Sequence, residues 1–177
     1  MKHVLNVIKY LLSVALYIVL LVFSTPAAFI VSLFTKAMPD NLPEYTWGGI
    51  WGTYDNAPQG DRKHLRKYPE TTGFKGYLGR VAWLRRNRLY GLKRKLSIPY
   101  SPVTLKGNPF ISDKYEISGW LFAYCDTGWE WYSVTPYMKG RCVRIRLGWK
   151  IKGDKYMQGS VAPMVFTINP FDTYGDD

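Results

Sequence analysis

Acidic and aromatic residues in the second half of the chain are the ones whose types and spacing could form an active site. They are Glu116, Asp126 and Glu130, interspersed with Trp120, Trp129 and Trp131. Paired carboxylates beside tryptophans that stack on a sugar ring are typical of glycosidases, so an enzyme acting on an envelope glycan is one hypothesis. Aromatic cross-strand pairs, with acids at hairpin ends, are the commoner arrangement in sheets, and we favour that interpretation.

Other catalytic or metal-binding patterns are weak. The two histidines are His3 and His64, and there is no phosphate-binding glycine loop, nucleophile elbow or zinc-protease motif. Asp55, Asn56 and Asp61 offer oxygen ligands for a divalent cation, but their spacing does not fit an EF-hand loop, and carboxylates that close turns are the favoured explanation. The sequence therefore predicts a non-enzymatic protein with no catalytic residue, no metal site and no cofactor.

The positive charge of the chain is concentrated in one segment. The formal net charge is +11, and residues 61–95 hold twelve Lys or Arg against two acids, whereas the other 142 residues hold twelve basic and eleven acidic side chains. Any anionic partner should therefore bind this segment. The residues predicted to bind it are Arg62, Lys63, Arg66, Lys67, Arg80, Arg86, Arg88, Lys93, Arg94 and Lys95.

Three interpretations of these cations remain open: a solvated helix face, a patch on anionic lipid headgroups, and a nucleic-acid site. Near an anionic leaflet a Lys or Arg contributes about 1 kcal/mol to binding. The lipid interpretation is favoured over nucleic acid because an apolar N-terminal stretch already places the chain at a bilayer. The sequence does not specify a protein partner.

This apolar stretch runs from Tyr10 to Thr35 without a charged residue. At about 1.5 Å per residue, a helix through it is long enough for the roughly 30 Å hydrocarbon core of a bilayer. A retained anchor is favoured over a cleaved signal peptide because the run exceeds the ~7 to 15 residues of a signal sequence's apolar region. Pro26 predicts either one kinked helix or a straight span over Val4 to Ser24 followed by an interfacial piece.

The expected topology is a single crossing with the N-terminus inside. Lys2 and Lys9 lie before the apolar run, whereas the acids Asp40 and Glu44 follow it, so the positive-inside rule favours this orientation. The basic segment that begins at Arg62 argues for the opposite orientation if it is counted as part of the flank.

The chain is expected to have three parts: a membrane anchor over residues 1–36, an ordered Pro/Gly/Trp-rich loop over 37–61, and a domain over 62–177. Tyr77 to Leu92 predicts an amphipathic basic helix. Arg85 falls in the middle of its apolar side, so Arg85 should pair with an internal carboxylate, or the helix should end before it.

After Lys114 the apolar period changes to two, which predicts strands. Cys142 to Ile151 places Val143, Ile145, Leu147, Trp149 and Ile151 on one face and Cys142, Arg144, Arg146 and Lys150 on the other, the pattern of a half-buried strand. Further strands are expected over Tyr115 to Cys125, Trp129 to Met138 and Val161 to Ile168. The fold class is therefore α+β, with an antiparallel meander of about four strands.

The same topology makes a prediction about the two cysteines. One strand of about ten residues would hold Cys125 and Cys142 roughly 30 Å apart. Because a disulfide needs Cα atoms within about 7 Å, we expect two free thiols.

Three motifs carry a resemblance to a known family. They are Trp51-Gly52-Thr53-Tyr54-Asp55-Asn56 with Pro58, Gly60 and Asp61; Gly79-Arg80-Val81 with Trp83, Leu84, Arg86, Asn87, Tyr90 and Gly91; and Arg146-Leu147-Gly148-Trp149-Lys150. In these motifs the chain resembles a family of small uncharacterised proteins encoded by tailed bacteriophages and prophages, with an N-terminal membrane segment. The resemblance implies a bacterial host and its inner membrane, and it brings no catalytic residues with it.

The leading hypothesis is a phage-encoded, single-pass inner-membrane protein. Its basic, aromatic-rich domain would lie at the bilayer surface and bind lipid headgroups or another anionic envelope component. The second hypothesis is a virion protein delivered into the host, which inserts in the membrane and contacts DNA.

Overall fold

A computed structural model describes residues 2–34, 49–51, 62–70, 72–152 and 161–175. The chain divides into two compact units: the sheet unit, residues 1–12 and 96–177, and the helical unit, residues 13–95. The first helix, α1 (Lys2–Leu33), contributes to both. Most of the expected loop over 37–61, including Asp55, Asn56 and Asp61, lies outside the described residues.

Helix α1 continues unbroken through Pro26 for 32 residues. Of the two arrangements expected from Pro26, the structure therefore has the single long helix and not a span that stops at Ser24. Just before the proline, the Ser24 hydroxyl donates a hydrogen bond to the Leu21 carbonyl at 2.6 Å. Val4–Leu33 is long and apolar enough to cross a membrane, which is also true of signal sequences and of buried helices.

The helical unit also contains α2 (Arg62–Lys67), α3 (Gly73–Arg86) and α4 (Tyr90–Lys95). The expected single helix over 77–92 is wrong in its bounds. α3 ends at Arg86 and is capped by Asn87, whose backbone N–H and side-chain amide both donate to the Trp83 carbonyl, at 2.9 and 3.1 Å. Leu89 then adopts a φ of +52°, a left-handed conformation that no helix continues through, so α4 starts afresh.

The buried face of α3 also differs from the expected one. Its buried residues are Gly76, Gly79, Val81, Trp83 and Leu84. Arg85 is exposed, and α3 continues past it to Arg86. Both alternatives expected for it are therefore wrong: it is not buried against a carboxylate, and the helix does not end before it. The reason is that Trp83, only 1% exposed, turns inward and packs edge-on against the His64 ring, at 5.0 Å between centroids. This rotates Arg85 to the outside.

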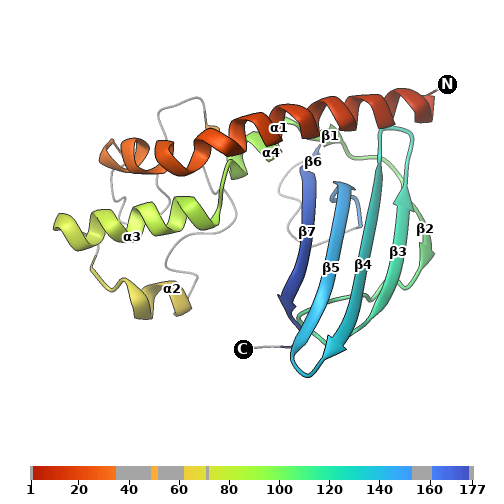
Figure 1. The fold of residues 1–177 in the computed structure, drawn as a ribbon. Helices are drawn as coiled ribbons and strands as arrows, with labels where there is room; N and C mark the ends of the chain where they lie inside the picture. Colours follow the sequence, from red (N-terminus) through yellow and green to blue (C-terminus); the bar gives the residue numbers. More distant parts are fainter. Residues whose placement is uncertain (1, 35–48, 52–61, 71, 153–160, 176–177) are drawn as a thin grey trace. The chain divides into compact units, whose positions relative to one another are not determined.

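The sheet unit contains a five-stranded sheet whose neighbours follow chain order (Figure 1). Its strands are β2 (Thr104–Gly107), β3 (Gly119–Tyr124), β4 (Trp129–Met138), β5 (Arg141–Trp149) and β7 (Met164–Thr173). All pairs are antiparallel, which confirms the meander and the α+β class and adds the unpredicted strand β2. A separate two-stranded sheet pairs β1 (Ile98–Pro99) with β6 (Val161–Ala162).

Which face of the large sheet is buried is the main departure from the expected pattern. A core cluster gathers Ile111, Leu121, Tyr132, Val134 and Cys142, so the Cys142 face of β5 is the interior one. Val143, Ile145 and Leu147 on the opposite face are only half-buried. At the end of the segment, however, Trp149 and Ile151 of the predicted apolar face are fully buried. Alternation thus located the strand correctly, and the predicted face is buried only at that end.

The two cysteines are free thiols, as expected, and both are buried. Cys125 lies just after β3, where its backbone N–H donates to the Gly128 carbonyl at 2.9 Å in the turn that leads to β4. Cys142 lies at the start of β5. The two hairpins expected between the strands are present at these turns.

The start of α1 packs on aromatic residues of the sheet unit. Tyr10 lies 5.0 Å from the Trp129 ring and 5.4 Å from the Trp149 ring between centroids, and its hydroxyl donates to the Val165 carbonyl at 3.0 Å. Asn6 donates to the Asp126 carbonyl at 3.1 Å. The first three turns of α1 are therefore part of the sheet unit's fold.

Candidate functional site: the apolar face of α1 and the basic helices

Helix α1 has the reverse of the polarity expected for a helix on the surface of a soluble protein. Its polar, uncharged side chains turn toward the protein: Tyr10, Ser13, Tyr17, Ser24 and Ser32 are buried, and Asn6 and Thr25 are half-buried. A surface helix in water instead buries its apolar stripe and exposes its polar one. We call the opposite side the apolar face; its exposed large residues are Val4, Leu5, Val7, Ile8, Leu11, Leu12, Leu16, Ile18, Val19, Val22, Phe23, Phe29, Ile30 and Leu33.

The apolar face is continuous along the helix. At about 100° per residue its side chains fall within one arc of roughly 180°; among the described polar side chains of α1, half-buried Thr25 reaches this arc, at the edge that Val7 marks. Lys9, the charged residue of α1 whose exposure is described, lies at the edge of this arc, with its ammonium 6.0 Å from the Trp149 ring. An exposed apolar surface of this length marks a lipid or protein interaction site.

The predicted anion-binding residues all belong to the helical unit. Arg62 and Lys63 begin α2, but their side chains lie outside the described part of the structure. Arg66 and Lys67, in the same helix, are exposed, as are Arg86, Arg88 and Lys95. These five side chains can meet an external anion.

Other cations of the segment are engaged within the helical unit. Arg80 is half-buried and donates from Nε to the Ser32 carbonyl at 3.4 Å. Half-buried Lys93 places its ammonium 4.8 Å from the Tyr17 ring of α1. Arg94 is also half-buried. For Arg80 and Lys93 the structural role competes with anion binding.

Arg85 is the residue that the sequence interpretation left out of the basic surface. It is exposed beside Arg86, and Arg88 folds back to donate from Nε to the Arg85 carbonyl at 2.9 Å. Three arginines thus cluster where α3 ends, at the negative end of its dipole, where cations are stabilised. A 3.6-residue period read from the buried Trp83 would have placed Arg85 correctly.

The acids considered for glycan chemistry do not form an open pair. Glu130 is 0% exposed, and its oxygens accept hydrogen bonds from Arg146 Nε at 2.6 Å and from the backbone N–H groups of Ile151 and Lys152 at 2.9 Å each. Both oxygens of Glu130 are therefore occupied inside the sheet unit. Glu116 and Asp126 are exposed. Trp120 and Trp131 stack on each other at 5.7 Å, as cross-strand aromatics do.

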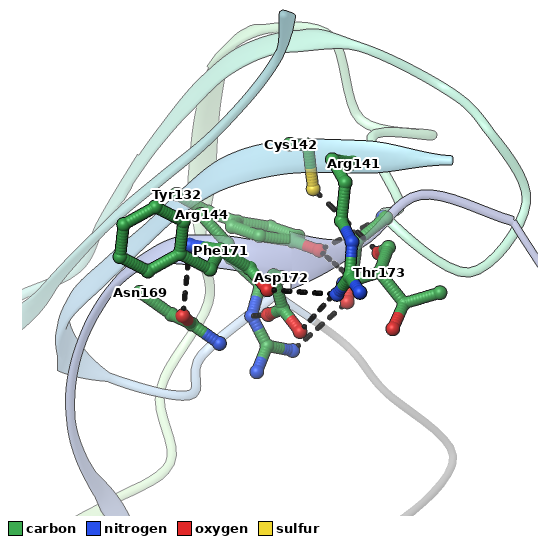
Figure 2. A network of polar contacts seen from close by, with 9 residues as sticks. Tyr132, Arg141, Cys142, Arg144, Asn169, Phe171, Asp172 and Thr173 are labelled. Atoms are coloured by element: carbon green, nitrogen blue, oxygen red, sulfur yellow. Dashed lines mark hydrogen bonds and ion pairs between the residues drawn. The ribbon is translucent and has the colours of Figure 1, made fainter. Parts of the chain in front are cut away.

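A second internal polar network lies where β5 begins and β7 ends. Arg144 forms ion pairs with Asp113 and with Asp172, and the Tyr132 hydroxyl donates to Asp113 at 2.6 Å. Figure 2 shows Arg144, Asp172 and Tyr132 converging from neighbouring strands. A bulge in β7 near Pro170 sets this register, because Cys142 pairs with Asp172 while Arg144 pairs with Asn169. The network fixes strand register on the interior face.

Tyr132 should give the sheet unit an alkaline limit. Burial, and then the hydrogen bond to Asp113, raise the pKa of Tyr132 above its usual value near 10. Above pH 10 the unfolded chain releases the phenol proton of Tyr132, whereas the folded protein keeps it. This contribution to the free energy of unfolding is therefore fully present below about pH 10, and it falls above that pH by about 1.4 kcal/mol per pH unit.

Tyr132→Phe should therefore cost about 1 kcal/mol at neutral pH and have a shallower loss of stability above pH 10 than the wild type. Urea unfolding followed by tryptophan fluorescence between pH 7 and pH 11 measures both quantities. Parallel alkaline slopes for the two proteins would show that Tyr132 is not held protonated by the fold.

Within the described residues there is no group of three or more His, Cys, Asp or Glu side chains suited to a metal ion.

Fold and surface together define an α+β protein with an antiparallel five-stranded sheet and an N-terminal apolar helix of membrane-spanning length. The chain belongs to a family of unknown function, DUF7338, whose family model matches residues 1–176. No curated protein and no solved structure matches it. The expected relation to a family without an assigned activity is confirmed, whereas its phage origin stays a prediction.

Proposed function

We propose that this is a non-enzymatic membrane protein held in a bilayer by α1, whose basic helical unit binds anionic lipid headgroups. The observation that carries the proposal is the polarity of α1, with its polar side chains turned to the protein and its aliphatic side chains exposed. Lipid is the surrounding in which this arrangement is favourable. From the resemblance to phage and prophage proteins, the membrane is proposed to be the bacterial inner membrane.

The exposed cations of the helical unit support the choice of headgroups as the anionic partner. Arg66, Arg85, Arg86, Arg88 and Lys95 belong to the same compact unit as residues 13–33 of α1. Insertion of α1 in lipid therefore brings them close to the membrane surface, where each contributes about 1 kcal/mol if the leaflet is anionic. No separate recognition of DNA or of a protein is needed for them to be engaged.

The test is a triple variant, Arg66→Gln, Arg85→Gln and Lys95→Gln, which removes one exposed cation from each of α2, α3 and α4. Protein released from detergent is offered anionic phosphatidylglycerol vesicles and neutral phosphatidylcholine vesicles together. The wild type should prefer the anionic vesicles, and the variant should lose about 3 kcal/mol of that preference, roughly a hundredfold in the distribution ratio.

A matched control removes the same charge from the sheet unit. Lys106→Gln, Lys114→Gln and Lys139→Gln change three exposed lysines outside the basic segment. This control should keep most of the anionic preference, and the preference of the wild type should shrink at high salt. Equal losses in the two triple variants would reject the helical unit as the headgroup site.

The alternative of a virion protein that meets DNA keeps the same membrane insertion and changes the partner. Mass spectrometry of purified particles distinguishes it, since only that alternative requires the protein in stoichiometric copies. The buried position of Glu130 gives no support to the glycan-enzyme alternative.

A further inference from the structure

The helical unit contacts one side of α1, from its middle to its last turn, with groups that are unfavourable in hydrocarbon. The Lys93 ammonium lies 4.8 Å from the ring of Tyr17. Toward the end of α1, the Tyr77 hydroxyl donates to the Phe29 carbonyl at 3.2 Å, and Arg80 reaches the Ser32 carbonyl. On this side, polar groups of the helical unit therefore lie against α1 at its middle and at its last turns.

The position of Tyr17 makes a crossing of the membrane difficult. At about 1.5 Å per residue, Tyr17 lies roughly 20 Å from Val4 and roughly 24 Å from Leu33, and both distances are shorter than the ~30 Å hydrocarbon core. Any crossing by Val4–Leu33 would thus place Tyr17 within the hydrocarbon core, with the Lys93 ammonium beside its ring. Charged side chains are rare and costly there.

A helix that lies in the plane of the membrane surface has no such conflict. Its apolar face enters the acyl chains of one leaflet, and its opposite side stays against the protein and the headgroups. Lys9, at the edge of the apolar face, would then reach outward to the headgroup level, as long cationic side chains do. The exposed arginines of α3, which belong to the same unit as residues 13–33 of α1, would lie on the side of the bilayer where that leaflet faces water.

We propose that α1 is an in-plane anchor, whose apolar face takes the acyl chains of a single leaflet along its whole length, in place of the expected single crossing. The inference rests on the proposed membrane function and specifies its geometry. It makes the protein monotopic, with both ends of α1 at the same depth and on the same side of the bilayer.

The test measures depth at three places along the apolar face. Leu5→Cys, Val19→Cys and Ile30→Cys each place a spin label at an exposed position of that face, and the three positions lie within about 40° of one another around the helix. The labelled full chain is reconstituted in vesicles of equal parts phosphatidylcholine and phosphatidylglycerol, and the label's collisions with oxygen and with a water-soluble nickel complex report its depth. Thr72→Cys, exposed and outside α1, gives the aqueous reference, and the unmodified chain, with its two buried cysteines, gives the background labelling.

The in-plane anchor predicts similar, shallow depths at all three positions. Depths that differ by about 10 Å or more among the three positions would overturn this inference, because only a helix that crosses the bilayer changes depth along its length; the proposed membrane function would remain. Labels as accessible to the nickel complex as the Thr72→Cys reference would overturn both.

Discussion

Replacing Glu130 with alanine is expected to destabilise the sheet unit by about 3 to 5 kcal/mol. The substitution removes the carboxylate that pairs with the Arg146 guanidinium, whose side chain is only 16% exposed, and it removes one hydrogen-bond acceptor each from the backbone N–H groups of Ile151 and Lys152. A largely buried guanidinium would then lose its carboxylate, and two backbone donors would each lose a hydrogen bond. Because small domains are stable by only about 5 to 15 kcal/mol, this loss is large enough to unfold the unit at moderate temperature.

Two variants separate the charge of Glu130 from its geometry. Glu130→Gln keeps an acceptor of the same shape and should cost less, about 1 to 3 kcal/mol. Glu116→Gln alters an exposed acid of the same unit and should stay within about 0.5 kcal/mol of the wild type. Urea unfolding of the full chain in detergent, followed by tryptophan fluorescence, measures all three. A Glu130→Ala protein as stable as the Glu116→Gln control would show that the buried ion pair does not stabilise the fold.

The Glu130→Gln and Glu116→Gln variants also test the glycan-enzyme hypothesis. Since Glu130 is buried and fully hydrogen-bonded, we expect its substitution to act through stability. A Glu130→Gln protein that stays folded yet loses a biological effect would restore a chemical role for this carboxylate.

The second large effect is expected at Gly148 in β5. Its φ is +99°, a conformation that residues with a side chain rarely adopt, and an added Cβ would lie 2.1 Å from the Trp129 carbonyl oxygen. Backbone strain and the clash together should make Gly148→Ala cost about 3 to 5 kcal/mol. Trp129 is also the ring that Tyr10 packs against, so the start of α1 should become easier to digest with protease.

Gly140→Ala is the matched control for this variant. Gly140 also has a positive φ, +69°, but nothing lies within 4 Å of the position that a Cβ would take. It should therefore show only the cost of the left-handed conformation, about 1 to 2 kcal/mol. The same urea assay compares the two variants. Equal losses would mean that Trp129 does not approach Gly148 as closely as the structure shows.

The sequence alone determined the elements that depend on local pattern. The charge-free run after Lys9 is long and aliphatic, so it specifies an apolar helix wherever the chain folds. Strict alternation over Cys142 to Trp149, with short turns on either side, specified the antiparallel strands and so the α+β class. It also separated the two cysteines, because a strand between them has a fixed length.

Only the tertiary structure decided which side of each element is inside. In β5 the alternation marks two faces but does not show which one is covered. The structure turns Cys142, Arg144 and Arg146 inward. The two arginines are tolerated there because Asp113 and Glu130, which are distant in sequence, supply carboxylates for their guanidinium groups. In α3 the sequence pattern likewise predicted Arg85 on the buried side. In the structure Trp83 is buried, which places Arg85 on the exposed side. For α1 the sequence shows that the helix is apolar, but it does not show which side contacts the protein and which side is exposed. The contacts of Tyr10 and Tyr17 show which stripe the protein covers, and the remaining side is the surface left for lipid.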